Sequence, residues 1–233
     1  MMKRFLKILG LLAIAGILFL VIAGFAMHKA LPKGKSGAEA DALAKKMLTA
    51  LNIDAYHNTR FLEWSFRDGA YQYKWDTWQR KVDVSWKDYT VKLNLKHPEK
   101  SLVMQQKEVI TGDEAEKLVA KALKSFHNDS FWLVAPYKVF DQGTKRTLVT
   151  LEGGQKGLLV TYIEGGTTPG DSYLWLLEEN GFPKAYQMWV DIIPIGGLEA
   201  SWDDWTITES GAFLPKTHQL GPMKIDMGSV RGY

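Results

Sequence analysis

Residues 61–95 read FLEWSFRDGAYQYKWDTWQRKVDVSWKDYTVKLNL, and this stretch decides the fold. Apolar or aromatic side chains occupy every second position in four short runs, and the turn-forming sequences Arg67-Asp68-Gly69 and Lys87-Asp88 separate runs. A period of two is typical of antiparallel strands that bury one face and leave the other in water. We predict four strands whose buried face consists of Leu62, Trp64, Phe66, Tyr71, Tyr73, Trp75, Val82, Val84, Trp86, Tyr89, Val91, Leu93 and Leu95.

Two amphipathic helices are predicted, one before and one after these strands. The first covers residues 38–51. The second begins at Thr111, which forms a capping-box pattern with Glu114 three residues later. The apolar stripes are Leu43, Met47, Leu48 and Leu51 in the first helix, and Ala115, Leu118, Val119, Ala122, Leu123 and Phe126 in the second.

The chain after the second helix returns to short alternating runs. Turn signals at Gly153-Gly154 and Asn180-Gly181 separate some of them. Only one helix interrupts the strand series, whereas parallel winding needs a crossover between neighbouring strands. We therefore expect an α+β fold, namely a curved antiparallel sheet or incompletely closed β-barrel with two packed helices, preceded by one transmembrane helix. The strands expected here cover residues 147–151, 157–163, 172–177, 185–191, 202–208 and 216–227.

The N-terminal segment carries the strongest hydropathy signal. Residues 8–27 read ILGLLAIAGILFLVIAGFAM, an uncharged run of 20 residues, which is long enough to cross a hydrocarbon core of about 30 Å. A cleaved signal peptide is the alternative, because basic residues precede the run and Gly24-Phe25-Ala26 fits a small-x-small cleavage site. We favour an anchor because signal-peptide cores span only about 7 to 15 residues.

The anchor predicts that the globular domain is exported. Basic residues flank the segment on both sides, so the positive-inside count barely distinguishes the two orientations. A short basic tail ahead of a large domain favours a single-pass protein of the cell membrane with its domain on the periplasmic or extracellular side, or a secreted protein if the segment is cleaved. The expected organisation is a cytoplasmic tail at 1–7, a transmembrane signal anchor at 8–27, a linker at 28–37 and a β-rich domain at 38–233.

Charge and composition exclude several classes of function. Six of the 29 Lys and Arg residues precede Glu39, the first acid, so 23 basic residues face 26 acidic ones in the rest of the chain and give a net charge of −3. A domain without clustered positive charge is poorly suited to binding the phosphate groups of a nucleic acid, so we expect no nucleic-acid partner. The sequence has no cysteine, which excludes disulfides, Cys-ligated zinc and thiol catalysis.

No motif in the sequence indicates catalysis, a metal or a cofactor. The five histidines are scattered and do not form the spacing of a zinc motif. His127, Asp129 and Asp141 offer acid–base groups, but no serine lies in a nucleophile elbow beside them. The glycine-rich segments 153–157 and 165–170 match no phosphate loop and fit turns better. We therefore expect a protein that is not an enzyme and has no cofactor and no metal.

The order of elements resembles the LolA/LolB-like superfamily, whose members bind lipoproteins and other lipids in a half-open antiparallel barrel closed by helices. The likeness covers residues 38–233. It lies in the leading amphipathic helix, the hairpins of 60–95, the helix after Thr111 and the closing stretch Ser201–Lys216, which reads SWDDWTITESGAFLPK. Two features depart from the family: no cysteine is present for the lipid of a LolB-like receptor, and an uncleaved anchor differs from a soluble LolA-like carrier.

The resemblance implies a lipid, lipoprotein acyl chain or other hydrophobic ligand held in the barrel. The stretch His127–Asp141, expected just after the second helix, would then lie near the barrel mouth. A solid core with an interaction or scaffold role is the alternative, because large aromatic residues also fill ordinary β cores. The expected ligand-binding residues are Trp64, Trp75, Trp86, Phe131, Trp132, Trp175 and Trp189 in the cavity and His127, Asp129, Lys138 and Asp141 at its mouth.

Overall fold

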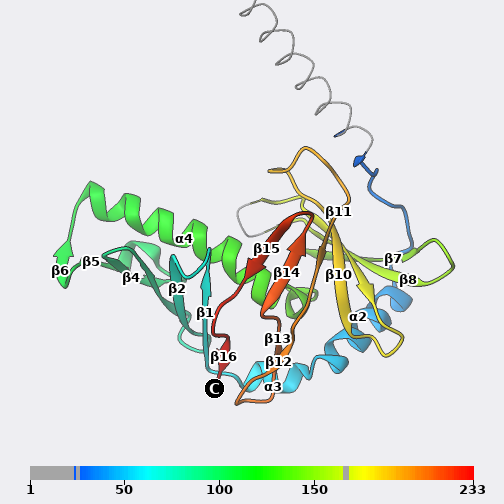
Figure 1. The fold of residues 1–233 in the computed structure, drawn as a ribbon, viewed down its shortest axis with the longest axis horizontal. Helices are drawn as coiled ribbons and strands as arrows, with labels where there is room; N and C mark the ends of the chain where they lie inside the picture. Colours follow the sequence, from blue (N-terminus) through cyan, green and yellow to red (C-terminus); the bar gives the residue numbers. More distant parts are fainter. Residues whose placement is uncertain (1–23, 25–26, 165–167) are drawn as a thin grey trace, which may run out of the picture.

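A computed structural model describes residues 24, 27–164 and 168–233. Over these residues the chain forms an α+β fold in which two large antiparallel sheets adjoin one long helix, α4 (Figure 1). The predicted α+β class and the antiparallel pairing are confirmed. The predicted membrane segment at 8–27 lies largely outside the described residues.

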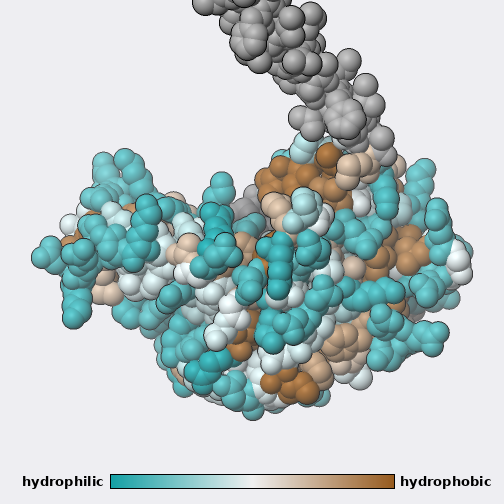
Figure 2. All heavy atoms as spheres, viewed as in Figure 1, coloured by the Kyte–Doolittle hydropathy of each residue, from teal (hydrophilic) through white to brown (hydrophobic). Residues whose placement is uncertain are grey.

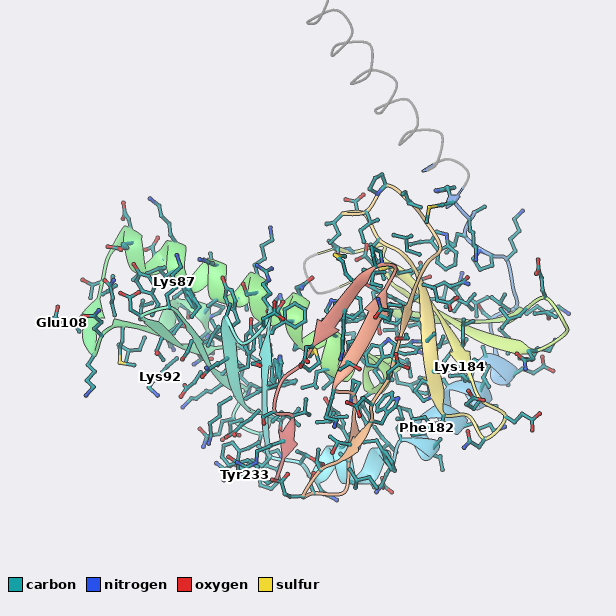
Figure 3. The ribbon with its side chains drawn as sticks, viewed as in Figure 1. Lys87, Lys92, Glu108, Phe182, Lys184 and Tyr233 are labelled. Atoms are coloured by element: carbon teal, nitrogen blue, oxygen red, sulfur yellow. The ribbon has the colours of Figure 1, made fainter. Side chains whose placement is uncertain are left out.

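The first sheet contains seven strands in the order β16-β1-β2-β3-β4-β5-β6. Its pairing follows the order of the chain, because each strand from β1 to β6 is hydrogen-bonded to the next. The free edge strand β6 is three residues long and includes Glu108, which with Lys87 and Lys92 surrounds the outer end of the sheet with charge (Figure 3). A short, charged edge discourages pairing with other chains. The strands are β1 (Phe61–Phe66), β2 (Tyr71–Asp76), β3 (Lys81–Trp86), β4 (Tyr89–Asn94), β5 (Leu102–Gln105), β6 (Glu108–Ile110) and β16 (Arg231–Gly232).

The register of the first sheet explains why its aromatic residues share one face. Trp64 lies opposite Tyr73, Tyr73 opposite Val84, and Val84 opposite Val91. These four side chains form a buried row across β1 to β4. Because residues two apart point to the same side of a strand, the rows above and below lie on the same face, where Trp75 and Tyr89 are half-buried and the other members are buried. The four strands predicted from residues 61–95 are confirmed.

The second sheet also has seven strands, in the order β15-β14-β11-β10-β9-β8-β7. The turns predicted at Gly153-Gly154 and Asn180-Gly181 are present, with all three glycines at positive φ. A separate two-stranded sheet consists of β12 (Thr206–Ile207) and β13 (Phe213–Leu214). The strands of the second sheet are β7 (Thr144–Thr150), β8 (Lys156–Tyr162), β9 (Ser172–Leu177), β10 (Pro183–Trp189), β11 (Leu198–Ser201), β14 (Thr217–Leu220) and β15 (Met223–Asp226).

The expectation of one large sheet needs correction. The described strands form two seven-stranded sheets, and neither closes into a barrel. The two sheets adjoin at one point, where the Ser65 backbone N–H donates to the Met227 carbonyl across 3.0 Å. The long runs predicted at 202–208 and 216–227 are divided into shorter strands, because Asp204 and Gly221 adopt left-handed backbone conformations that reverse or kink the chain.

Two short helices precede the first sheet. Helix α2 (Ala38–Ala50) confirms the first predicted helix, and α3 (Ile53–Asn58) adds a third helix that the sequence pattern did not indicate. The buried face of α2 is formed by Ala40, Ala44 and Met47, followed by Leu51. The small alanines allow α2 to lie close against β7 and β8 of the second sheet.

Helix α4 (Asp113–Val134) is longer than predicted and ends eight residues beyond Phe126. The predicted capping box is wrong, because Gly112 is the N-cap residue and no side chain caps the helix. The first part of α4 adjoins β4, β5 and the 3-10 turn η1 (Pro98–Lys100), and its end continues into η2 (Ala135–Lys138) beneath the second sheet (Figure 1). Helix α4 therefore extends from the buried face of the first sheet to the buried face of the second.

Candidate functional site

The interior between α4 and the second sheet contains a dense group of aromatic side chains. Helix α4 supplies two of them, β8, β9 and β10 supply four, the residue after β11 supplies one and β14 supplies a histidine. Each ring contacts at least one other member. We call this group the inner aromatic cluster; it consists of Phe131, Trp132, Tyr162, Tyr173, Trp175, Tyr186, Trp202 and His218.

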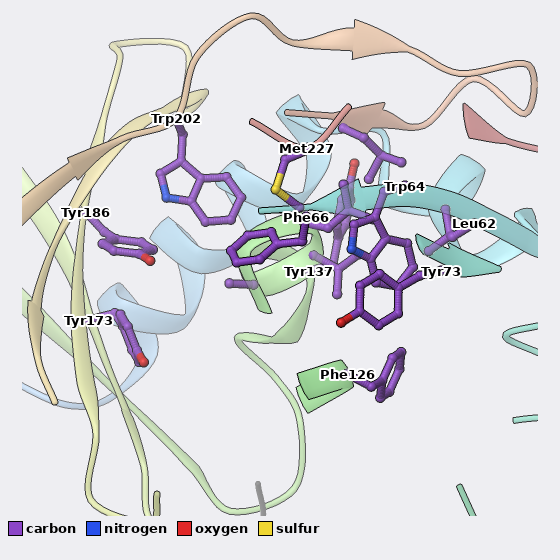
Figure 4. Packing of buried hydrophobic residues seen from close by; sticks show 14 of the residues in the cluster. Leu62, Trp64, Phe66, Tyr73, Phe126, Tyr137, Tyr173, Tyr186, Trp202 and Met227 are labelled. Carbon is purple, nitrogen blue, oxygen red and sulfur yellow. The ribbon is translucent and has the colours of Figure 1, made fainter. Parts of the chain in front are cut away.

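Tyr186 lies at the centre of this cluster. Its ring centroid is 5.1 Å from that of Tyr173, 5.2 Å from Trp175 and 5.5 Å from Trp202. Figure 4 shows Tyr173, Tyr186 and Trp202 extending from the second sheet into the interior that Phe66 faces from β1. Residues from both sheets therefore line one continuous apolar interior.

Several polar atoms in the inner aromatic cluster lack a hydrogen-bond partner in the protein. They are the Tyr162 hydroxyl, the indole Nε1 atoms of Trp175 and Trp202, and the His218 Nε2 atom, all of them buried. An unsatisfied buried polar group costs about 1–3 kcal/mol. These four atoms are the hydrogen-bonding groups that the cluster offers to a bound molecule.

His218 is held as a neutral base. Its Nδ1 atom lies 3.0 Å from the Ser201 carbonyl, which only accepts, so Nδ1 carries the proton of the neutral ring and Nε2 is left as the acceptor nitrogen. Burial lowers the pKa of His218 to about 4, although the carbonyls of Ser201 and Trp132 and the charge of Asp203 act in the opposite direction. The cluster thus offers two N–H donors, one hydroxyl and one acceptor.

A second aromatic group, the first-sheet cluster, lies between α4 and β1 to β3. Trp64 stacks on Tyr73 with centroids 4.6 Å apart, and Phe126 of α4 meets the edge of Trp75 at 5.1 Å. The indole nitrogens of Trp64 and Trp75 are also buried and unpartnered. We define the first-sheet cluster as Trp64, Tyr71, Tyr73, Trp75, Trp86 and Phe126.

The predicted cavity residues fall into three places. Phe131, Trp132 and Trp175 belong to the inner aromatic cluster, and Trp64, Trp75 and Trp86 belong to the first-sheet cluster. Trp189 belongs to neither, because it lies on the opposite face of β10 from Tyr186. There it contacts a small separate apolar group, and its Nε1 donates to the Lys29 carbonyl across 2.7 Å.

The four predicted mouth residues do not form one group. Asp129 is fully buried, accepts hydrogen bonds from the Tyr73 hydroxyl at 2.5 Å and the Asn128 amide at 2.8 Å, and has a pKa raised by burial. His127 is partly buried on α4 with Nδ1 unpartnered, and burial followed by the charge of Lys138 lowers its pKa. Lys138 and Asp141 form an ion pair close to solvent. The stretch 127–141 was expected to follow the helix. Residues 127–134 instead form the last two turns of α4, which extends to Val134.

Sequence reasoning missed five members of the inner aromatic cluster. All five lie in predicted strands, and the alternation of the strands at 157–163, 172–177 and 185–191 could have indicated Tyr162, Tyr173 and Tyr186. Trp202 and His218 come from irregular or short segments, and they meet only because β11 pairs with β14. No local pattern in the sequence carries that information.

The described residues contain no group of three or more acidic or histidine side chains placed to bind a metal ion. The surface formed by the described residues includes two hollows away from the inner aromatic cluster. One, of about 400 Å³, lies on β1 to β3 and includes Glu63, Gln72 and Asp83, and the other, of about 340 Å³, lies between Asp171 and the loop after β10. Comparison with protein-family models, curated proteins and solved structures gives no match.

Proposed function

We propose that this chain is a membrane-tethered protein of the cell envelope that binds a lipid, a lipoprotein acyl chain or another hydrophobic ligand. In this proposal the two sheets act as a half-open barrel around α4, and residues 8–27 anchor the chain in the membrane. The observation that carries the proposal is the inner aromatic cluster, an apolar interior with four unpartnered polar ring atoms or hydroxyls. Binding, rather than catalysis, is the proposed activity.

The cluster suits an amphiphilic molecule. A hydrocarbon chain gains about 0.8 kcal/mol for each methylene that leaves water, so a short acyl segment among these rings provides useful affinity. An ester or amide carbonyl supplies an acceptor for the indole N–H groups of Trp175 and Trp202. His218 Nε2 accepts from a hydroxyl or amide of the same ligand. These groups distinguish an acyl ester or amide from a plain hydrocarbon.

A scaffold domain with a solid core is the alternative function, and the ring geometry favours it in one respect. Trp175 meets Tyr186 at an interplanar angle of 84°, and Trp202 meets His218 at 73°. Edge-to-face contacts of this kind stabilise closed aromatic cores without any ligand. Under this alternative the same residues act only in stability and in presenting a surface to a protein partner.

Binding of a fluorescent fatty acid separates the two functions. The full chain, held in an amphipathic polymer, is titrated with dansyl-undecanoic acid. We expect saturable binding, and we expect Trp175→Phe and Trp202→Phe each to raise the Kd about fivefold, because each loses one hydrogen bond worth about 1 kcal/mol.

The control variant is Trp86→Phe, which replaces the indole of another buried tryptophan, in the first-sheet cluster. It is expected to lower stability like the other two variants while leaving the Kd unchanged. Absence of saturable binding by the wild-type chain contradicts the ligand-binding proposal and favours the scaffold.

A further inference from the structure

An apolar loop lies exposed at the point where the N-terminal segment joins the domain. The loop connects β10 to β11 and contains Ile192, Ile193, Pro194 and Ile195 in sequence. Ile192 is 70% exposed, whereas Ile193 and Ile195 are half-buried. Figure 2 shows a brown, hydrophobic area at this end of the molecule, next to the start of the described chain. An exposed apolar patch of this kind marks a binding surface more often than a random feature.

The first described residues are fastened to this loop. The Lys29 backbone N–H donates to the Gly196 carbonyl at 2.9 Å, and the Gly196 N–H donates to His28 Nδ1 at 3.1 Å. Trp189 Nε1 donates to the Lys29 carbonyl, and the Gly24 backbone lies beside the Ile195 side chain. The segment directly after the predicted anchor is therefore held against residues 189–197.

The linker remains attached further along the chain. Lys35 and Leu148 exchange two backbone hydrogen bonds, of 3.0 and 2.8 Å. The close approach depends on glycine, because a Cβ atom at Gly34 would collide with the Leu148 carbonyl and one at Gly196 would lie 2.5 Å from the Trp189 ring. The linker is thus held along the edge of the second sheet.

The surroundings of the loop match a lipid surface. Met27 and Leu31 are exposed apolar residues on the adjoining segment. Lys29, Lys33 and Lys35 are exposed on the same segment, and basic side chains next to an apolar patch favour anionic lipid headgroups. The hollow of about 340 Å³ between Asp171 and Pro194 opens beside this loop.

We infer that the loop at 190–197, together with Met27 and Leu31, docks on the surface of the bilayer that residues 8–27 enter. This inference rests on the proposed membrane tether. It adds that the domain does not hang freely from its linker but rests on the lipid surface with the β10–β11 loop inserted among the headgroups. The second-sheet end of the interior then faces the membrane, the source of an acyl ligand.

Fluorescence of a single labelled cysteine tests the inference, because the native chain has no cysteine. The full chain with Ile192→Cys carries a nitrobenzoxadiazole label and is reconstituted in vesicles of phosphatidylethanolamine and phosphatidylglycerol. Ile207→Cys is the matched control, since Ile207 is also an exposed isoleucine, at 65%, but lies on β12 of the separate two-stranded sheet, near α3 and away from the β10–β11 loop (Figure 1). We expect a blue-shifted emission for the label at 192 and several-fold stronger quenching by lipids spin-labelled near their headgroups.

A second variant and a separate extraction distinguish the possible failures. Adding Gly196→Ala to Ile192→Cys displaces the linker, and we expect it to reduce the quenching toward that of the 207 label. Equal, water-like emission from both labels in a chain that resists alkaline carbonate extraction overturns the docking but leaves the tether intact. Release of the wild-type chain by carbonate overturns both.

Discussion

His218 is a residue whose environment decides its chemistry. Burial among aromatic rings removes water from the imidazole, and the Ser201 carbonyl fixes the proton on Nδ1. The charged form is therefore disfavoured, and the pKa falls to about 4. A neutral imidazole is what the proposed ligand site requires, because only this form presents Nε2 as an acceptor.

The lowered pKa of His218 predicts a loss of stability in mild acid. In the unfolded chain histidine takes up a proton near pH 6.5, whereas in the folded chain it does so only near pH 4. Protonation of His218 in the unfolded chain should therefore lower the free energy of unfolding by about 3 kcal/mol as the pH is lowered from 6.5 to 4. Above pH 6.5 this destabilisation is absent.

Urea denaturation of the wild type and His218→Gln between pH 7 and 4 measures this contribution. The difference in the free energy of unfolding between the wild type and His218→Gln should become smaller as the pH falls, because only the wild type has the titrating imidazole. The buried Asp129 carboxyl has a raised pKa and so the opposite pH dependence, but it contributes equally to both proteins. His57→Gln, which changes an exposed histidine on α3, serves as the control and should follow the wild type. A constant difference between wild type and His218→Gln across this range would show that His218 does not titrate as proposed.

At the scale of elements, one hydrogen bond joins β2 to α4. The Tyr73 hydroxyl donates to the buried Asp129 carboxylate, which lies 56 residues further along the chain. We expect Tyr73→Phe to lower the free energy of unfolding by about 1–3 kcal/mol, because it removes a donor from a buried carboxyl group. Equilibrium unfolding in urea measures the change.

Tyr71→Phe is a close match for this test. Tyr71 lies on the same face of β2, two residues away, and is also buried, but no hydrogen bond joins its hydroxyl to the described protein. Its loss should cost much less than that of the Tyr73 hydroxyl. Equal losses in the two variants would indicate that Asp129 does not hold α4 to the first sheet.

The elements predicted best are those specified by neighbouring residues. The hairpins of 61–95 followed from alternation and short turns, because each strand pairs with the next. The end of α4 could not be predicted in this way, because the polar residues from His127 to Ser130 are typical of a solvent-exposed segment. Asp129 is buried there because Tyr73, from a distant strand, completes its hydrogen bonding. The extent of the helix therefore depends on a tertiary contact.

The residues of the candidate site likewise divide into those that the local sequence pattern indicates and those that only long-range pairing brings together. Trp175 was identified from its strand, whereas Trp202 and His218 come together through the pairing of β11 with β14 and through the Gln219 N–H bond to the Ser201 hydroxyl at 2.8 Å. The backbone hydrogen bond from Ser65 to Met227 links the chain after the second sheet to the first sheet. Long-range pairings of this kind have no local signature in a single sequence.

At the scale of the whole molecule, the membrane segment and the domain belong to one arrangement in our proposal. No helix in the described part of the chain has the length and hydropathy to span a bilayer. The predicted span at 8–27 rests on the uncharged run in the sequence. The linker hydrogen bonds at Lys29 and Lys35 hold residues 29–35 to the second sheet. Our proposal adds that an acyl ligand enters the inner aromatic cluster from the adjoining lipid.

Native mass spectrometry of the full chain, released from lipid nanodiscs after incubation with envelope lipids, tests the central claim most directly. We expect a discrete added mass of one lipid or acyl ligand for each chain, retained by Trp86→Phe and diminished in Trp175→Phe. A chain that carries no added mass under these conditions, while unfolding cooperatively in solution, would contradict ligand binding and identify the aromatic interior as a solid core.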